Sequence, residues 1–139
     1  MKMEKAMDCK KNVLIIDDSA INRKICCKLL QNTYTLLEAA NGEEGLRVLK
    51  ERASEIDAVI LDLVMPVMDG YEFLEHIAQN EQWKKIPILI ATGDNERGAE
   101  TRCLQLGAWD FVSKPYLPEV LRLRLKNIID LSQMSLLKK

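Results

Sequence analysis

Five polar residues could form one reactive site, because each of them comes just after an apolar run. Asp17 and Asp18 follow residues 13–16, Asp62 follows 58–61, Thr92 follows 88–91, and Lys114 comes two residues after 109–112. Two negative charges about 4 Å apart repel each other by about 4 kcal/mol at an effective dielectric near 20, so three adjacent carboxylates would require a cation. Ligands that are all oxygen, without Cys or His, favour Mg²⁺. The residue types therefore predict a magnesium site with a hydroxyl and an ammonium group beside it.

Apolar runs and longer amphipathic stretches alternate along the chain in five units. The pattern predicts strands at 12–16, 34–38, 57–61, 86–91 and 109–112, and helices at 19–31, 43–52, 71–80, 95–106 and 118–131. The first, third and fourth strands lack polar alternation, which is typical of parallel strands buried on both faces. We therefore expect a doubly wound α/β domain. In such a domain the carboxyl ends of the strands would bring the five polar residues together.

Two of the predicted helices differ in their apolar faces. In helix 19–31, Ser19 can cap the first turn, and Ile21, Ile25 and Leu29 have the spacing of a buried stripe. Helix 95–106 has a much smaller apolar stripe, so we expect it to shift at modest cost.

The composition excludes several classes of protein. The chain has 139 residues, a formal net charge of −1 and a pI near 5.9, which disfavours binding to nucleic acid or to an anionic membrane. No apolar run approaches the ~20 residues of a membrane-spanning helix, and the N-terminal segment lacks the apolar core of a signal sequence. The four cysteines, which are Cys9, Cys26, Cys27 and Cys103, form no C-x-x-C pair and favour reduced thiols. We therefore expect one cytoplasmic domain.

Specific motifs surround the five polar residues. The acidic pair lies in the segment LIIDDS, Asp62 lies in ILDLVMPVMDG, Thr92 follows ILIA, and Gly107-Ala108 precedes the pair Lys114-Pro115. This set resembles the receiver domain of two-component response regulators over roughly residues 11 to 131. The resemblance implies a flavodoxin-like fold, with five parallel strands in the order 2-1-3-4-5 and five flanking helices.

The resemblance also implies roles for the site residues. Asp62 would accept a phosphoryl group, Lys114 would neutralise its charge, and Thr92 would bind one of its oxygens. The expected metal ligands are Asp17, acting mainly through water, Asp18, Asp62 and the backbone carbonyl of Val64. Since a carboxylate and a phosphoryl group repel each other, such catalysis depends on neutralisation and positioning. Apart from phosphorylation and dephosphorylation of Asp62, we expect no enzymatic activity. A cis bond is expected before Pro115.

Phosphorylation would act as a switch in a protein of this kind. The resemblance implies that Thr92 moves toward the phosphoryl group and that an aromatic ring, here Phe111, turns inward. Since Phe111 has no hydroxyl to hold it outside, we expect its ring to face inward already. The face formed by 95–106, 109–112 and 118–131 would contact an output domain, an effector or a second copy of the chain. The phosphodonor would be a sensor histidine kinase or a histidine phosphotransfer protein.

The two ends of the chain are expected to lie outside the domain. We expect a flexible tail at 1–11, a receiver domain at 12–131 and a helical extension at 132–139, because no Gly or Pro stops the last helix after Pro118. The extension is either a frayed end or a linker to an output domain absent from this chain. Its sequence weakly resembles that of receivers joined to cyclic-di-GMP enzymes.

Three alternatives remain open. A haloacid-dehalogenase-like phosphatase would need an acid two residues after Asp62, where Val64 stands. A flavodoxin-type electron carrier would bring its flavin phosphate against Asp17 and Asp18, which would repel it. A degenerate receiver would bind partners without phosphorylation and would not need the five site residues. The sole histidine, His76, is expected on a polar helix face, so the chain has no phosphohistidine module of its own.

Overall fold

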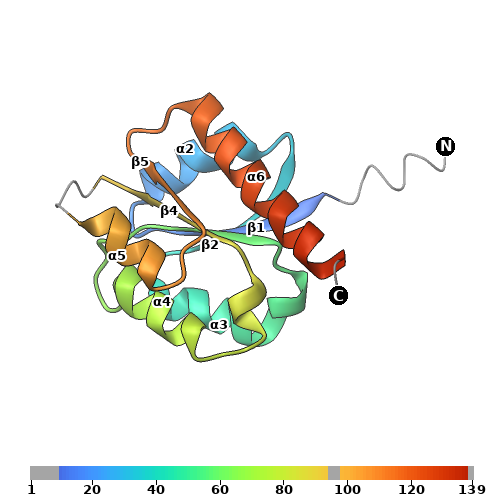
Figure 1. Ribbon diagram of the computed structural model, residues 1–139. Coiled ribbons are helices and arrows are strands. Elements are labelled where there is room, and N and C mark those ends of the chain that lie inside the picture. The colour runs from blue at the N-terminus through green and yellow to red at the C-terminus, as the bar shows by residue number, and fades with distance from the viewer. Residues whose placement is uncertain (1–9, 94–97, 138–139) are drawn as a thin grey trace.

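A five-stranded parallel sheet forms the centre of the computed structural model, which describes residues 10–93 and 98–137 (Figure 1). The strands are β1 (Lys11–Ile16), β2 (Tyr34–Ala39), β3 (Ala58–Leu61), β4 (Ile88–Thr92) and β5 (Asp110–Ser113). Their order is β2-β1-β3-β4-β5, and every pairing is parallel. The predicted fold class and strand order are confirmed. Most of the predicted tail, 1–9, lies outside the described residues.

Helices cover both faces of the sheet (Figure 1). On one face lie α2 (Ala20–Leu30) and α6 (Pro118–Leu137), and on the other lie α3 (Gly42–Arg52), α4 (Gly70–Ala78) and α5 (Ala99–Gln105). Two short 3₁₀ helices that the sequence did not predict, η1 (Ala53–Glu55) and η2 (Trp83–Lys85), precede β3 and β4. None of the helices within the described ranges has the length and apolarity needed to cross a membrane.

Strand β1 contributes to a separate core on each face. Leu14 and Ile16 pack in the cluster that includes residues of α3, α4 and α5, whereas Val13 and Ile15 pack with residues of α2 and α6. Because successive side chains of a strand point to opposite faces, a strand that is covered on both sides must be apolar throughout. Burial of each such side chain stabilises the folded state by roughly 2 kcal/mol. This packing holds the end of β1, and therefore Asp17, in place.

Strand β4 begins two residues later than predicted. Residues 86 and 87 precede the strand because the amide of Ile86 donates to Trp83 in η2, at 3.0 Å, and Pro87 has no N–H for a ladder. The strand extends to Thr92, which the prediction had placed just beyond it. Helix α5 begins at Ala99, and residues 95–97 of the predicted helix lie outside the described residues.

The buried stripe predicted for the first helix is wrong. Ile21 is 72% exposed and Ile25 is 45% exposed, Leu29 is partly buried, and the helix packs instead through Cys26 and Leu30. The spacing of apolar residues identified a helix but did not give its rotation about its own axis.

Arg23 explains the rotation of α2. Its Nη1 donates to the backbone carbonyl of Asp17 at 2.7 Å, and its Nε donates to Glu38 of β2 at 2.9 Å. These two bonds turn the Arg23 side of the helix toward the sheet, so the isoleucines remain in solvent. The predicted cap is confirmed, because Ser19 Oγ accepts from the amide of Asn22 at 3.2 Å.

Helices α5 and α6 differ greatly in how firmly they are packed. In α5 only Ala99 and Cys103 are buried, with Leu106 packed beside them at the end of the helix. Its small apolar stripe agrees with the prediction. In contrast, α6 is one helix of 20 residues that reaches Leu137, so the predicted extension continues it without a break as far as the described residues go.

Candidate functional site

The three carboxylates meet at the carboxyl edge of the sheet. Oxygens of Asp17, Asp18 and Asp62 all lie within 4.8 Å of one another. Strands β1 and β3 are adjacent, with Ile16 paired to Leu61, so the residues that follow the two strand ends must be neighbours. The amide of Asp62 donates to the carbonyl of Ile16 at 2.9 Å, which fixes this arrangement.

Lys114 extends into the same cluster from the other side. Its Nζ donates to Asp17 Oδ2 at 2.6 Å and lies 3.6 Å from Asp62 Oδ1. Its backbone amide donates to the carbonyl of Thr92 at 3.0 Å, which joins the ends of β4 and β5. The Lys114-Pro115 peptide bond is cis, as expected. The ammonium group is therefore held beside two carboxylates.

Asp17 uses both of its carboxylate oxygens within the protein. Oδ1 accepts from the amide of Ser19 at 2.9 Å, while Oδ2 accepts from Lys114. Asp17 is 3% exposed, whereas the neighbouring Asp18 is exposed to solvent. A metal ion could therefore reach Asp18 and Asp62 more directly than Asp17.

The groups around Asp62 do not fully offset the cost of burying its negative charge. Burial raises the pKa of Asp62 above its ordinary value, and the negative charge of Asp17 raises it further. The Lys114 ammonium and hydrogen bonds from Thr92 and from the backbone of Leu63 act in the opposite direction. Since the raised pKa means that burial prevails, an added cation would stabilise the charged form.

Thr92 and Phe111 lie on neighbouring strands next to the carboxylates. Thr92 ends β4 and is buried, and Phe111 of β5 is 9% exposed and packs in the cluster that contains residues of α4 and α5. The ring thus has the expected inward position. Val64 lies in the loop two residues after Asp62, with its side chain exposed.

Gly70 is a residue whose importance was missed in the sequence. A Cβ on Gly70 would lie 2.6 Å from the carbonyl oxygen of Asp62 and 2.8 Å from Cα of Leu63. Its amide donates to the carbonyl of Leu63 at 2.9 Å, so the start of α4 is pressed against the segment that holds the carboxylate. The pair Asp69-Gly70 was visible in the sequence, but a motif does not reveal how closely two backbones approach.

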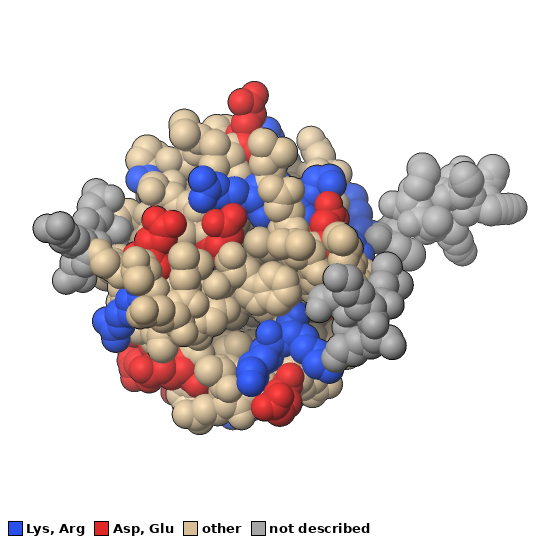
Figure 2. Space-filling model, viewed as in Figure 1, with Lys and Arg blue, Asp and Glu red and all other residues tan. Residues whose placement is uncertain are grey.

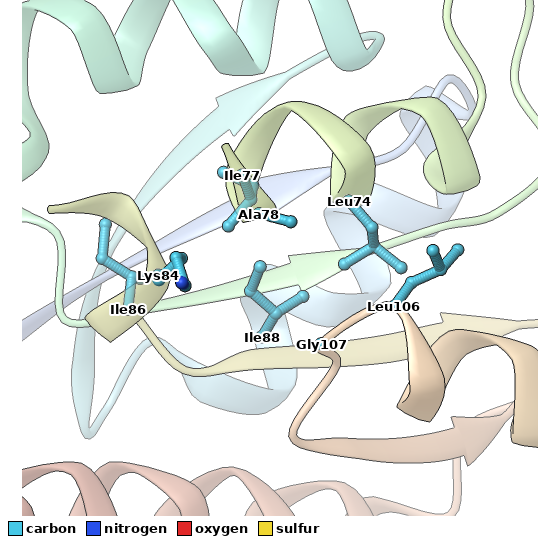
Figure 3. Close-up of a pocket in the computed structure, with 8 residues that line it drawn as sticks. All are labelled: Leu74, Ile77, Ala78, Lys84, Ile86, Ile88, Leu106 and Gly107. Atoms are coloured by element: carbon cyan, nitrogen blue, oxygen red, sulfur yellow. The ribbon is translucent and has the colours of Figure 1, made fainter. Parts of the chain in front are cut away.

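A separate apolar cavity lies between α4 and the end of α5 (Figure 3). It has a volume of about 120 Å³ and is lined by Leu74, Ile77, Ala78, Lys84, Ile86, Ile88, Leu106 and Gly107. Side chains of α4 and Ile88 of β4 point into it from opposite sides (Figure 3). It shares no residue with the acidic cluster and lies toward the amino end of β4.

The carboxylate cluster has the donor set that a hard divalent cation requires. Mg²⁺ usually keeps several waters and is held by one or two carboxylates, and the exposed Asp18 beside the buried Asp62 fits that pattern. The mixture of buried and exposed oxygens leaves room for water or phosphate oxygens in the coordination shell. The residues therefore fit Mg²⁺.

Mg²⁺ is expected to stabilise the folded protein. At a concentration 100 times its dissociation constant it should raise the free energy of unfolding by about 2.7 kcal/mol at neutral pH. This Mg²⁺-dependent stabilisation should shrink on acidification, because protons compete with the metal for the carboxylates. Since the pKa of Asp62 is raised, the loss should begin at a higher pH than it would for an ordinary aspartate. Urea titrations with and without Mg²⁺ at several pH values measure both effects.

Two variants control this measurement. Asp18→Asn should lose most of the Mg²⁺ effect, whereas Asp130→Asn should keep it, because Asp130 is an exposed partner of Lys126 on α6. Equal stabilisation of both variants by Mg²⁺ would mean that the ion binds elsewhere.

Comparison with known proteins identifies related chains. A family model described as the response regulator receiver domain matches residues 13–126. The sensor histidine kinase CheAY of Helicobacter pylori is 38% identical over 120 residues, which are 86% of this chain and 15% of that protein. The chain spans only 8 to 32% of the length of the first four curated relatives that it matches.

Solved structures agree with this match. The chemotaxis protein CheY4 of Vibrio cholerae is 31% identical with a TM-score of 0.79, over 86% of this chain and 99% of that one. The receiver domain of the sensor histidine kinase PA1611 of Pseudomonas aeruginosa is 26% identical with a TM-score of 0.79, over 88% of this chain and 99% of that one. That structure has a magnesium ion coordinated in its active site cleft.

Proposed function

Because the chain belongs to the response regulator receiver family, we propose that Asp62 accepts a phosphoryl group from a phosphohistidine of a sensor histidine kinase or a histidine phosphotransfer protein. A carboxylate oxygen of Asp62 would attack phosphorus while the bond to the histidine nitrogen breaks. The observation that supports this assignment is the position of Asp62, a buried carboxylate flanked by Asp18 on one side and Lys114 on the other. An alternative degenerate receiver is not favoured, since the site residues are present and assembled.

Mg²⁺ would supply positive charge to the entering phosphoryl group. We assign Asp18, Asp62 and the backbone carbonyl of Val64 as its direct protein ligands, with Asp17 acting through water. The two hydrogen bonds that occupy the oxygens of Asp17 support this division. The magnesium ion in the PA1611 receiver supports the choice of metal.

Lys114 and Thr92 would then bind the transferred group. Lys114 lies near enough to Asp62 to contact a phosphoryl oxygen, although in the unphosphorylated protein its shorter contact is with Asp17. The hydroxyl of Thr92 already bonds to Asp62, so it could move onto the phosphoryl group with little displacement. Both residues would thus sense phosphorylation directly.

The signal would pass to the face formed by α5, β5 and α6. Arg102 of α5 lies over the ring of Tyr71 of α4, 3.8 Å from its centre, and the end of α5 borders the apolar cavity. A short helix that buries only two side chains, beside a cavity, can shift without breaking a core. Phe111 on β5 would connect Thr92 to this helix. The face could then bind an output domain, an effector protein or a second copy of the chain.

Exposed apolar residues indicate where the phosphodonor would dock. They lie in three segments next to the carboxylates, and they are Ile21, Ile25, Val64, Val67 and Leu117. Val67 has a φ of 71°, which is strained for a β-branched residue. Such strain and exposure are typical of contact surfaces.

Substitution of Ile25 tests this docking surface. Ile25→Ser should slow transfer from a phosphorylated kinase or phosphotransfer protein about tenfold, since it removes an apolar contact. The rate with acetyl phosphate should not change, because that donor needs no docking surface. Leu131→Ser is the matched control, since Leu131 is also an exposed residue of a helix but lies near the far end of α6. Equal slowing by both variants would contradict the assignment.

The chain would work as a regulatory module in the cytoplasm. The described cysteines Cys26, Cys27 and Cys103 are free thiols, which suits a reducing compartment. Acidic and basic side chains are interspersed on the face seen in Figure 2, which does not suggest a nucleic-acid surface. Any enzymatic output would belong to a further domain, to which residues 132–139 could connect the receiver domain at 12–131.

Phosphorylation by acetyl phosphate tests the proposal. With Mg²⁺ the protein should gain the mass of one phosphoryl group, and with a chelator it should not. Phosphorylation that is independent of Mg²⁺, or no phosphorylation under either condition, would contradict the proposed mechanism.

A further inference from the structure

We propose that Arg23 of α2 is a positioning residue for the magnesium site, because its guanidinium holds the backbone of the acidic pair Asp17-Asp18 against β2. The inference rests on the proposed function, since it assigns a residue that orients two of the carboxylates around the metal. Arg23 offers no oxygen to the metal, and its positive charge would repel a cation. Any favourable effect on Mg²⁺ binding must therefore pass through the groups to which Arg23 bonds.

The guanidinium of Arg23 joins the end of β1 to the edge strand β2. Its Nη1 donates to the backbone carbonyl of Asp17 at 2.7 Å, and its Nε donates to Oε1 of Glu38 at 2.9 Å. The Arg23 side chain is only 18% exposed, so water competes weakly for these donors. Because the guanidinium is a rigid planar fork, holding the carboxylate of Glu38 also fixes the direction of the bond to Asp17.

The carbonyl of Asp17 lies just beyond the ladder between β1 and β2. The last paired residues are Ile16 and Ala39, and the amide of Asp17 still donates to the carbonyl of Ala39 at 3.1 Å. The next group along the chain is the carbonyl of Asp17, and Arg23 supplies its donor. Since a peptide unit is planar, a donor that holds this carbonyl also sets the direction in which the backbone of Asp18 continues.

Asp18 depends on this peptide unit more than its neighbours do. The carboxylate of Asp17 accepts from the amide of Ser19 and from Lys114, and Asp62 is held through its own amide, which donates to Ile16 of β1. Asp18 is exposed, so the direction of its side chain follows from its backbone. If the peptide unit turned, the Asp18 carboxylate would leave the position in which its oxygen lies within 4.8 Å of those of the other two carboxylates.

Arg23→Gln separates positioning from charge. We expect the affinity for Mg²⁺, measured by calorimetry without a phosphodonor, to fall roughly threefold to tenfold, the range that corresponds to one hydrogen bond. Charge alone predicts the opposite sign, because removal of a positive charge near a cation site would strengthen Mg²⁺ binding. The Mg²⁺ concentration that half-saturates phosphorylation by acetyl phosphate should rise by the same factor. The rate at saturating Mg²⁺ should stay within about twofold, since the metal then restores the site.

Arg122→Gln is the matched control. Nε of Arg122 donates to the carbonyl of Leu29 at 3.1 Å, so this residue makes the same kind of bond at the opposite end of α2. The variant should keep its Mg²⁺ affinity within about twofold, because the bond that it loses is remote from the carboxylates. A general loosening of α2 would instead weaken Mg²⁺ binding in both arginine variants.

Two further variants examine how Arg23 acts. Arg23→Lys keeps the charge but replaces the planar fork with a single ammonium, so its Mg²⁺ affinity should lie between those of the unaltered protein and Arg23→Gln. Glu38→Gln removes the charged partner of the guanidinium. When it is combined with Arg23→Gln, the double variant should bind Mg²⁺ no more weakly than Arg23→Gln alone, because Glu38 acts through Arg23.

Four results would overturn the inference. They are unchanged or tighter Mg²⁺ binding in Arg23→Gln, an equal loss in Arg122→Gln, a double variant in which the two effects multiply, and no Mg²⁺ binding by the unaltered protein. If Arg23→Gln does not fold, the comparison of Arg23→Lys with Arg122→Gln still decides. Failure of the proposed function would look different, because Mg²⁺ would then bind with these relative affinities while acetyl phosphate left the unaltered protein unmodified.

Discussion

Asp62→Asn is expected to abolish phosphorylation by acetyl phosphate and to stabilise the protein when Mg²⁺ is absent. The amide oxygen that the substitution introduces is too weak a nucleophile to attack phosphorus, and the neutral side chain removes a buried charge that lies near two other carboxylates. We expect the free energy of unfolding at pH 7 to increase by on the order of 1 kcal/mol. Urea unfolding and intact mass measure the two effects.

The stabilisation should depend on pH in a defined direction. Burial raises the pKa of Asp62, so the folded state of the unaltered protein binds this proton more tightly than the unfolded state does. The folded state is therefore favoured at low pH, and this stabilisation is lost as the pH rises through the raised pKa. The Asp62→Asn variant has no ionisable side chain at this position, so it lacks this pH dependence. The difference between the two proteins should therefore be largest at neutral pH and should shrink on acidification. Phosphorylation of the variant at the normal rate would show that another residue is the acceptor.

Gly70→Ala is expected to disturb the backbone that carries Asp62. Its Cβ would lie 2.6 Å from the carbonyl oxygen of Asp62, and backbone atoms cannot give way as a flexible side chain can. Overpacking of this kind costs about 1–3 kcal/mol. Because the displaced atoms belong to Asp62 and Leu63, we expect the phosphorylation rate to fall at least about tenfold as well. Urea unfolding and acetyl phosphate kinetics measure the two losses.

Gly93→Ala is the matched control for that variant. A Cβ on Gly93 would have only Cβ of Lys114 nearby, at 4.0 Å, which is ordinary contact. This variant should remain within about 0.5 kcal/mol of the parent stability. If both glycine variants behave alike, the close packing of α4 against β3 does not determine the geometry of Asp62.

Much of the fold followed from local patterns in the sequence. Continuous apolar runs identified the central strands, since only burial on both faces explains them, and the polar residues that follow those runs identified the edge where the site lies. The inward position of Phe111 was expected from the family resemblance together with the ring's lack of a hydroxyl. The confirmed features depend on neighbours in the chain or on the general geometry of a parallel sheet.

The features that were wrong or missed depend on contacts between distant segments. The rotation of α2 is set by Arg23, which bonds to Asp17 and Glu38, so the apolar spacing of Ile21 and Ile25 was misleading. The start of β4 is set by η2, which has no apolar pattern of its own.

Direct mapping of the phosphorylated residue tests the central proposal most directly. The protein is treated with acetyl phosphate and Mg²⁺, the acyl phosphate is reduced with borohydride to leave homoserine, and the position of the change is read by peptide mass spectrometry. We predict conversion at Asp62 alone, and none when Mg²⁺ is chelated. Conversion at Asp17 or Asp18 instead, or a modified residue that is not an aspartate, would contradict the account.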